Sequence, residues 1–226
     1  MATRKNPPSK HPQKLHGLYA ITPFNSAHIL PVSTLIEQVR LAIDGGVRLL
    51  QFRDKSPDEK SRLDKARALK SLCGDNAVTL LINDDVALAG EVGADGVHIG
   101  ADDASIQHAR EQLGKTAIIG VSCYNQLALA QQAQSAGADY VAFGRFFPSQ
   151  SKPNAVQAEL ALLEQAKSTL QVPVACIGGI TAENATLLVR RGADMLAVID
   201  GIFGQPDIRQ AARDIAALMP GPASER

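Results

Sequence analysis

Short apolar runs alternate along the chain with longer segments in which apolar residues recur at helical spacing. The apolar runs predict strands at residues 18–21, 47–52, 78–82, 96–99, 117–121, 140–143, 172–177 and 195–199. The intervening segments predict helices at 35–43, 57–73, 86–92, 104–113, 126–136, 156–170, 182–191 and 207–218. The strands are nearly continuous in apolarity, which is typical of parallel strands covered on both faces. The pattern therefore predicts eight consecutive strand–helix units.

A short motif recurs between predicted helices and strands, as Gly93-Ala-Asp95, Gly137-Ala-Asp139 and Gly192-Ala-Asp194, with Gly45-Gly46-Val47 at the matching place earlier. Helix end, turn and strand start in that order indicate the αβ loop of a repeated unit. Eight such units in about 210 residues predict an α/β protein with a single (β/α)8 TIM barrel. An open doubly wound sheet is the alternative, but no Gly-x-Gly-x-x-Gly follows the first strand.

The ends of the chain carry no such pattern. Residues 1–15 are polar, basic and proline-bearing, which predicts a short disordered N-terminal tail. The barrel is expected to span residues 16–220 as the catalytic domain, and 221–226 form a C-terminal tail. Within the barrel, Asp103 is the expected N-cap of helix 104–113, and Thr181 is expected to open helix 182–191.

Composition narrows the class of protein. The formal net charge is zero, which gives no electrostatic basis for binding nucleic acid or a membrane surface. No apolar run is long enough to span a bilayer, and the first residues lack the apolar core of a signal peptide. The three cysteines, Cys73, Cys123 and Cys176, are widely spaced, as expected of reduced thiols in the cytoplasm.

The second predicted strand ends in the segment Gln51-Phe-Arg-Asp-Lys55. Because strand side chains alternate between faces, Gln51, Arg53 and Lys55 are expected to point the same way. Two cations at the end of a buried strand are unfavourable unless an anion such as phosphate or pyrophosphate balances them. The alternative is that Arg53 and Lys55 cap a surface loop and pair with Asp54 or Asp58.

The active site of such a barrel lies at the C-terminal ends of its strands. Polar residues expected there include Asn83, Asp84 and Asp85, His98, Asp102 and Asp103, Ser122, the loop 144–153, Gly178-Gly179, and Ile199-Asp200. Asp84 and Asp103 end neighbouring strands, and such carboxylates suit Mg²⁺ together with substrate phosphates. Helix capping is the alternative for each aspartate.

Two further segments suggest phosphate contacts. Ser149, Ser151 and Lys152 are able to hold phosphate oxygens, unless their loop is merely solvated. Gly178-Gly179 lets the backbone present amides to a phosphate, unless it forms a plain tight turn. His98 is interpreted as a hydrogen-bonded structural histidine rather than a base. The residues alone therefore predict a cytoplasmic Mg²⁺-dependent barrel enzyme that acts on a pyrophosphate, with a second phosphate site at strands seven and eight.

Seven segments in order resemble the thiamine phosphate synthase (thiamine-phosphate pyrophosphorylase) family, and the likeness covers about Gly17 to Gly204. They are Tyr19-Ala-Ile-Thr22, Gln51-Phe-Arg-Asp-Lys55, Asn83-Asp84-Asp85, His98-Ile-Gly100 with Asp103, Gly120-Val-Ser122, Gly144 with Pro148-Ser-Gln-Ser-Lys152, and Ile177-Gly-Gly-Ile180.

The resemblance implies a transferase of thiamine biosynthesis. It would condense 4-amino-2-methyl-5-(diphosphooxymethyl)pyrimidine with 4-methyl-5-(2-phosphoethyl)thiazole to give thiamine phosphate and pyrophosphate. The family is thought to react through a dissociative, carbocation-like pyrimidine, so that no strong protein base is needed. The implied partners are these small-molecule substrates, with Mg²⁺ as cofactor and no nucleic acid or membrane; a homo-oligomer is left open.

The resemblance also implies roles, residue by residue. The implied metal ligands are Asp84 and Asp103. The implied catalytic residues are Arg53, Lys55 and Lys152, which grip the pyrophosphate with help from Gln51 and Asn83, and Ser122 on the pyrimidine side. The substrate-binding set is completed by Phe52, Asp54, Ser149, Gln150, Ser151, Gly179, Ile199 and Asp200. Of these, Ser149 to Ser151, Gly179 and the backbone of Ile199-Asp200 would hold the thiazole phosphate.

Three positions depart from the family pattern. Ser149-Gln-Ser151-Lys152 replaces a usual Thr-x-Thr-Lys and keeps both hydroxyls. Asp200 stands where serine is common, and a carboxylate there repels a phosphate unless only the backbone faces it. Pro23 replaces a frequent acid.

Three alternative functions are weighed against the synthase. A thiazole tautomerase shares the barrel but needs no full pyrophosphate grip. A non-catalytic phosphate-binding barrel would not need the metal pair. A phosphosugar isomerase or aldolase would need a base or a Schiff-base lysine inside the barrel. The set of Arg53, Lys55, Asp84, Asp103 and Lys152 favours the synthase.

Overall fold

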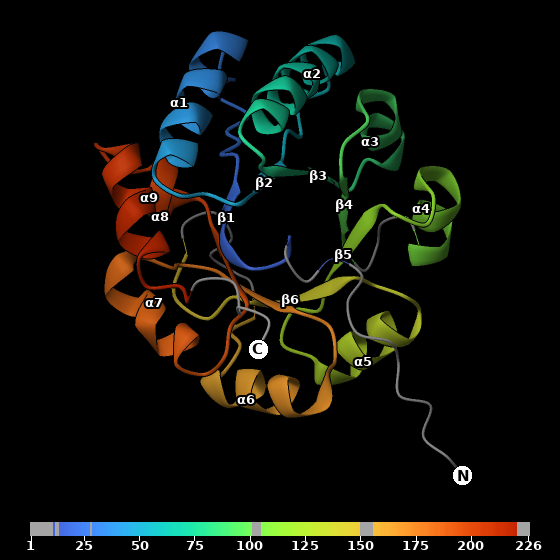
Figure 1. Ribbon diagram of the computed structural model, residues 1–226, viewed down its shortest axis with the longest axis vertical. Helices are drawn as coiled ribbons and strands as arrows, with labels where there is room; N and C mark the ends of the chain where they lie inside the picture. The colour runs from blue at the N-terminus through green and yellow to red at the C-terminus, as the bar shows by residue number, and fades with distance from the viewer. Residues whose placement is uncertain (1–10, 12–13, 28, 101–104, 150–155, 221–226) are drawn as a thin grey trace.

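The computed structural model describes residues 11, 14–27, 29–100, 105–149 and 156–220. These residues form a closed barrel of eight parallel strands in the order β1 to β8, with helices around it (Figure 1). The strands are β1 (Gly17–Ile21), β2 (Leu49–Phe52), β3 (Thr79–Asn83), β4 (Gly96–Ile99), β5 (Ile118–Ser122), β6 (Tyr140–Gly144), β7 (Val174–Ile177) and β8 (Met195–Val198). The predicted (β/α)8 TIM barrel is confirmed.

The helices follow the strands in turn. They are α1 (Val32–Asp44), α2 (Glu59–Asp75), α3 (Val86–Val92), α4 (Ile106–Leu113), α5 (Leu127–Ser135), α6 (Leu160–Thr169), α7 (Ala182–Val189), α8 (Asp200–Phe203) and α9 (Ile208–Ala216). Within the described part of the chain, no helix is long and apolar enough to cross a membrane.

Both faces of the barrel wall are buried, which explains why the strands read as continuous apolar runs. One cluster fills the interior and includes Tyr19, Leu49, Tyr140 and Met195. A larger cluster, to which Leu50 belongs, lies between the strands and the surrounding helices. Successive residues of a strand alternate between the two clusters, so the side-chain direction at each strand end follows from the strand register.

The starts of α4 and α6 differ from the sequence prediction. Helix α4 begins at Ile106 with Ser105 as its N-cap, whose Oγ accepts from the His108 N–H at 3.1 Å. The prediction that Asp103 is this N-cap is therefore wrong, because Ser105 makes the capping bond. Helix α6 begins at Leu160 rather than at residue 156, because the backbone at Glu159 is still extended.

The short helix α8 was not predicted at all. It follows Ile199 and contains only Asp200 to Phe203. Four residues are too few to show a helical period, so a hydrophobic pattern has no means of finding it. Thr181, in contrast, opens α7 as predicted, and its N–H donates to Asn184 Oδ1 at 3.0 Å.

The Gly-Ala-Asp motifs build the N-terminal end of the barrel. Gly93, Gly137 and Gly192 have positive φ angles of 63°, 97° and 87°, which glycine adopts without steric cost. Each glycine turns the chain from a helix toward β4, β6 or β8. The interpretation of this motif as a repeated αβ loop is therefore confirmed.

The aspartate of each motif binds one residue of the preceding strand at two points. The Asp139 N–H donates to the Ile119 carbonyl at 2.8 Å, and Asp139 Oδ2 accepts from the Ile119 N–H at 2.9 Å. The same pair of bonds joins Asp95 to Leu80 and Asp194 to Val174. We call these three arrangements the aspartate clamps.

The fourth matching place lacks a clamp. The Arg48 N–H donates to the Leu18 carbonyl at 2.9 Å, which is the backbone bond of the other three places. Arg48 has no carboxylate to accept a second bond, so β1 and β2 meet without the side-chain contact. The clamps therefore join β3 to β4, β5 to β6 and β7 to β8.

Candidate active site

The Gln51 side chain of strand β2 lies in the barrel interior. Gln51 is 3 % exposed, and its Nε2 donates to the Tyr19 hydroxyl at 2.6 Å. Phe52 belongs to the outer cluster and ends the strand. The alternation argument therefore places Gln51 but does not extend to Arg53 and Lys55, which lie in the loop beyond the strand.

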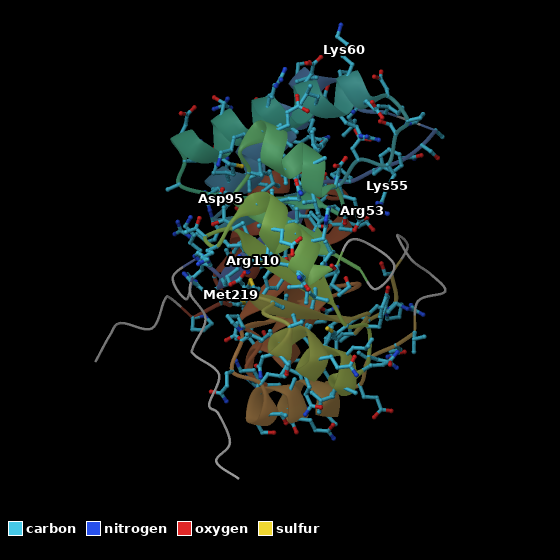
Figure 2. All side chains as sticks on the ribbon, turned by 90° about the vertical axis from the view of Figure 1, so that its right-hand side faces the viewer. Arg53, Lys55, Lys60, Asp95, Arg110 and Met219 are labelled. Atoms are coloured by element: carbon cyan, nitrogen blue, oxygen red, sulfur yellow. The ribbon has the colours of Figure 1, made fainter. Side chains whose placement is uncertain are left out.

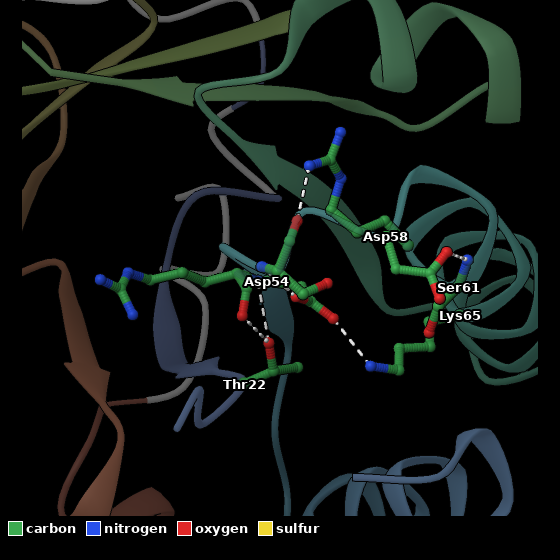
Figure 3. A network of polar contacts seen from close by, with 8 residues as sticks. Thr22, Asp54, Asp58, Ser61 and Lys65 are labelled. Atoms are coloured by element: carbon green, nitrogen blue, oxygen red, sulfur yellow. Dashed lines mark hydrogen bonds and ion pairs between the residues drawn. The ribbon is translucent and has the colours of Figure 1, made fainter. Parts of the chain in front are cut away.

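The loop after β2 is held by polar contacts on both sides (Figure 3). The Arg53 N–H donates to Thr22 Oγ1 at 2.8 Å, and this hydroxyl donates to the Arg53 carbonyl at 3.2 Å. On the other side, Lys65 of α2 donates to Asp54 Oδ2 at 2.8 Å, with both side chains at most 5 % exposed. The backbone of Arg53 is thereby fixed at the C-terminal end of the barrel.

Asp54 serves the fold in this arrangement. Burial raises its pKa, but hydrogen bonds from Lys65 and Ser56 outweigh burial, and the net effect is a pKa below the ordinary value. Asp58 is the N-cap of α2 and accepts from the Ser61 N–H at 2.9 Å. The alternative in which Lys55 pairs with Asp54 or Asp58 is wrong, because its partner is Asp84.

Lys55, Asn83 and Asp84 meet where β2 and β3 end. The Lys55 ammonium and the Asn83 amide both donate to Asp84 Oδ2, the amide at 2.6 Å. Asp84 adopts a positive φ of 62°, and its N–H donates to the His98 carbonyl at 2.8 Å. Left-handed backbone at a non-glycine residue is uncommon and often marks functional positions.

A cavity of roughly 240 Å³ opens beside these three residues. Its charged lining also includes Arg62 and Asp85. Arg62 donates to the Ser56 carbonyl at 2.8 Å, and Asp85 Oδ1 accepts from the Leu88 N–H as the N-cap of α3. Sequence reasoning missed Arg62, because one arginine in a charged helix carries no distinguishing signal.

The donor set at Asp84 partly tests the predicted magnesium site. Among the described residues, no three His, Cys, Asp or Glu side chains gather as metal ligands. Mg²⁺ commonly binds one or two carboxylates and completes its shell with water and phosphate oxygens, so a lone aspartate fits. The second predicted ligand, Asp103, lies outside the described residues.

Ser122, at the end of β5, belongs to a hydrogen-bonded interior network. Its Oγ lies 2.8 Å from His98 Nε2, and His98 Nδ1 lies 2.7 Å from the Tyr140 hydroxyl. His98 is hydrogen-bonded through both ring nitrogens, as predicted, and its structural rather than basic role stays a prediction. Sequence reasoning missed Tyr19 and Tyr140, although tyrosine hydroxyls in apolar strands need a buried partner and were therefore a usable signal.

The turn after β7 packs against the loop after β6. A Cβ on Gly178 would lie 2.2 Å from Arg145 Cβ, and one on Gly179 would lie 2.1 Å from the Pro148 carbonyl oxygen. Both glycines also have positive φ angles, 102° and 62°. Glycine is therefore required at both positions of this turn, and the predicted phosphate contact of Gly179 stays a prediction.

The remaining predicted residues lie near this turn or outside the described residues. Ser149 is partly buried at the end of the described loop, while Gln150, Ser151 and Lys152 lie outside the described residues. Ile199 is the N-cap of α8, and Asp200 is its first, exposed residue.

Charged and polar side chains thus line a cavity at the C-terminal end of a (β/α)8 barrel, which is where enzymes of this class carry their active sites. The profile of the family described as thiamine monophosphate synthase matches residues 18–202. The chain belongs to this family, as the quoted segments predicted.

Individual relatives agree with this assignment. The chain is 49 % identical to the thiamine-phosphate synthase of Thioalkalivibrio sulfidiphilus over 210 residues, which cover 91 % of this chain and 96 % of that one. It is 51 % identical to the enzyme of Nitrosococcus oceani over 198 residues, with coverages of 88 % and 90 %. The solved thiamine phosphate pyrophosphorylase of Pyrococcus furiosus superposes with a TM-score of 0.81 at 31 % identity, covering 92 % and 96 % of the two chains.

Proposed function

We propose that this chain is a thiamine-phosphate synthase, a transferase that joins the pyrimidine pyrophosphate to the thiazole phosphate. The observation that carries the proposal is the cluster of Lys55, Asn83 and Asp84 at the ends of β2 and β3. Family membership supplies the substrates, and this cluster supplies charges suited to a leaving pyrophosphate.

The reaction exchanges one bond at the pyrimidine methylene carbon. The bond from this carbon to the pyrophosphate oxygen breaks, and its electron pair leaves with the pyrophosphate. The lone pair of the thiazole nitrogen forms the new carbon–nitrogen bond, which leaves a positive charge on the thiazolium ring. The protein has to align the two substrates and neutralise the leaving group, and it needs no strong base.

In this scheme, the leaving pyrophosphate is bound by Arg53, Lys55 and Lys152, with help from Asn83. Mg²⁺, when bound, neutralises charge on the leaving group, and Asp84 and Asp103 would hold it. The Lys55–Asp84 pair suits this change of partners, because the Lys55 side chain is 47 % exposed and such pairs are weak. Lys55 would then bind a phosphate oxygen, and the Asp84 carboxylate would be available to hold Mg²⁺.

The other predicted contacts divide between the two substrates. Ser122 faces the pyrimidine and ends the hydrogen-bonded network that begins at Gln51. Ser149 to Ser151, Gly179 and the backbone of Ile199-Asp200 hold the thiazole phosphate. Phe52 and Asp54 support the site indirectly, because Phe52 packs in the outer core and Asp54 binds Lys65. The reduced, buried cysteines suit a cytoplasmic location.

Pyrophosphate release tests the proposal. Purified protein is mixed with both substrates in the presence of Mg²⁺, and then with EDTA, with each substrate omitted in turn. We expect release only when both substrates and Mg²⁺ are present. Absence of release from folded protein that still binds thiazole phosphate would contradict the synthase and favour the tautomerase or a non-catalytic binder.

A further inference from the structure

A continuous chain of hydrogen bonds crosses the barrel interior from β2 to β5. Its four contacts join Gln51 Nε2 to the Tyr19 hydroxyl at 2.6 Å, Tyr19 to the Tyr140 hydroxyl at 2.9 Å, Tyr140 to His98 Nδ1 at 2.7 Å, and His98 Nε2 to Ser122 Oγ at 2.8 Å. Five strands contribute one residue each. The chain begins deep in the barrel and ends at a partly exposed hydroxyl.

The direction of these bonds follows from counting protons. The Gln51 amide nitrogen can only donate, so the Tyr19 hydroxyl accepts from it. Tyr19 then has one proton left, and the Tyr140 oxygen is its acceptor among the described residues. If Tyr140 donated to Tyr19 instead, the Tyr19 proton would be unpaired at a site that is 1 % exposed. An unpaired buried donor is strongly unfavourable, so Tyr19 donates to Tyr140.

The same count of protons sets the direction of the two remaining hydrogen bonds, from Tyr140 to His98 and from His98 to Ser122. Tyr140 accepts from Tyr19 and therefore donates its own proton to His98 Nδ1. A neutral imidazole that accepts at Nδ1 carries its proton on Nε2, so His98 donates to Ser122 Oγ. Ser122 thus accepts from inside the barrel, and among the described residues nothing takes its own proton. That proton is available to a bound molecule.

We propose that Gln51, Tyr19 and Tyr140 fix His98 in the Nε2–H tautomer and thereby make Ser122 a hydrogen-bond donor to an unprotonated ring nitrogen of the pyrimidine. Tyr19, Tyr140 and His98 are positioning residues in this assignment, and Ser122 is the one that touches the substrate. The identity of the acceptor rests on the proposed function. The tautomer does not, because it is a property of the protein without substrate.

Burial keeps the direction of the chain constant near neutral pH. Burial raises the pKa of Tyr19 to about 12, against hydrogen bonds with Tyr140 and Gln51 that lower it. Burial also raises the pKa of Tyr140 well above its ordinary value, and Tyr19 beside it adds to the effect. Both phenols therefore keep the protons that the chain requires.

Nitrogen-15 NMR of histidine-labelled full-length protein measures the tautomer directly. The chain has five histidines, and the His98 signals are identified by their loss in His98→Asn. We expect a proton coupled to Nε2 and a bare Nδ1. A proton on Nδ1 would overturn the proposal.

Two tyrosine variants test whether the chain of hydrogen bonds from Gln51 to Ser122, which we call the relay, sets the His98 tautomer. Tyr140→Phe removes the donor to Nδ1, and we expect mixed His98 tautomers and a KM for the pyrimidine substrate raised about tenfold, with the KM for thiazole phosphate unchanged. Tyr19→Phe leaves Tyr140 able to donate, so the tautomer should persist. Tyr124→Phe, at an exposed tyrosine, is the control and should leave the NMR pattern unchanged. An unchanged tautomer in folded Tyr140→Phe would refute the relay, and wild-type NMR decides the tautomer if that variant does not fold.

Substrate analogues test the donor role of Ser122. Each ring nitrogen of the pyrimidine is replaced by CH in turn, and binding is measured by calorimetry. One replacement should weaken binding to the wild type about tenfold, but should have no effect on binding to Ser122→Ala. Equal binding of all analogues to the wild type would overturn the donor role. A confirmed tautomer in a protein that releases no pyrophosphate would instead fault the proposed function and leave the relay intact.

Discussion

The two ends of the barrel use the same chemical pair, an aspartate and a cation, for different purposes. At the N-terminal end, Asp139 binds Arg110 at 2.7 Å and also clamps the backbone of Ile119. At the C-terminal end, Asp84 binds the side chains of Lys55 and Asn83. Figure 2 shows Asp95 and Arg110 toward one end of the molecule, and Arg53 and Lys55 toward the other.

The difference lies in what holds the carboxylate. Asp139 is 5 % exposed at its side chain and accepts from the backbone as well as from Arg110, so its removal leaves a buried N–H unpaired. Asp84 is 24 % exposed, and its Lys55 partner is 47 % exposed, so the pair can separate at little cost. An aspartate bound to backbone stabilises the fold, whereas one bound only by partly exposed side chains can serve a ligand.

The largest effect is expected from Lys55→Ala, which removes a charge from the pyrophosphate grip. We expect kcat to fall by about 10²–10³, since a preorganised charge at the leaving group acts mainly in the transition state. The free energy of unfolding should change by less than about 0.5 kcal/mol. Steady-state kinetics and urea unfolding measure the two quantities. Lys115→Ala, an exposed lysine beyond α4, is the matched control, and similar kinetics in both variants would contradict the role of Lys55.

The next effect should appear at the other end of the barrel. Asp139→Ala leaves the Ile119 N–H and the partly buried Arg110 without their partner, and we expect a loss of about 2–4 kcal/mol in the free energy of unfolding. Activity per folded molecule should not change. Asp139→Asn keeps an oxygen for the Ile119 N–H and should lose less. A lowered kcat in folded Asp139→Ala would contradict the purely structural role of Asp139.

Asp84→Asn should change the metal requirement alone. The amide can still accept from Lys55 and Asn83 but binds Mg²⁺ less strongly, so we expect the Mg²⁺ concentration for half-maximal activity to rise about tenfold. Titration of the rate with Mg²⁺ measures this shift. An unchanged titration curve would place the metal on other ligands.

The smallest effect concerns acid stability. The pKa of Asp54 is lowered in the folded protein: burial raises it, but the bonds from Lys65 and Ser56 outweigh burial. A lowered folded pKa contributes stability that is complete above the unfolded pKa, near 4, and is lost as the pH falls through the folded pKa. Asp54→Asn should therefore show a flatter decline of stability between about pH 5 and pH 2 than the wild type. Urea unfolding across this range would reveal parallel declines if Asp54 contributes nothing.

The sequence predicted the parts of the molecule that repeat. The strand–helix alternation and the Gly-Ala-Asp motif identified the barrel, and the strand ends identified Lys55, Asn83 and Asp84, which the fold brings together. Family resemblance then supplied the substrates, which no charge pattern specifies.

Contacts between distant segments escaped prediction. Tyr19 and Tyr140 stand 121 positions apart, and each looks like an ordinary core residue until the barrel closes. Lys65 appeared to be one more lysine on a charged helix, although it is buried against Asp54. Ser105 replaced Asp103 as a cap because both residue types cap well and only the backbone geometry selects between them.

The three aspartate clamps divide the ring of strands into pairs. Each clamp joins an even-numbered strand to the odd-numbered strand before it. The barrel is therefore built of four strand pairs, and only the pair β1–β2, with Arg48 at the matching position, has no clamp among the described residues. Thermal opening of the barrel should then start at the pair β1–β2. These two strands carry Tyr19 and Gln51, so their transient opening would separate Gln51 and Tyr19 from the rest of the hydrogen-bonded chain.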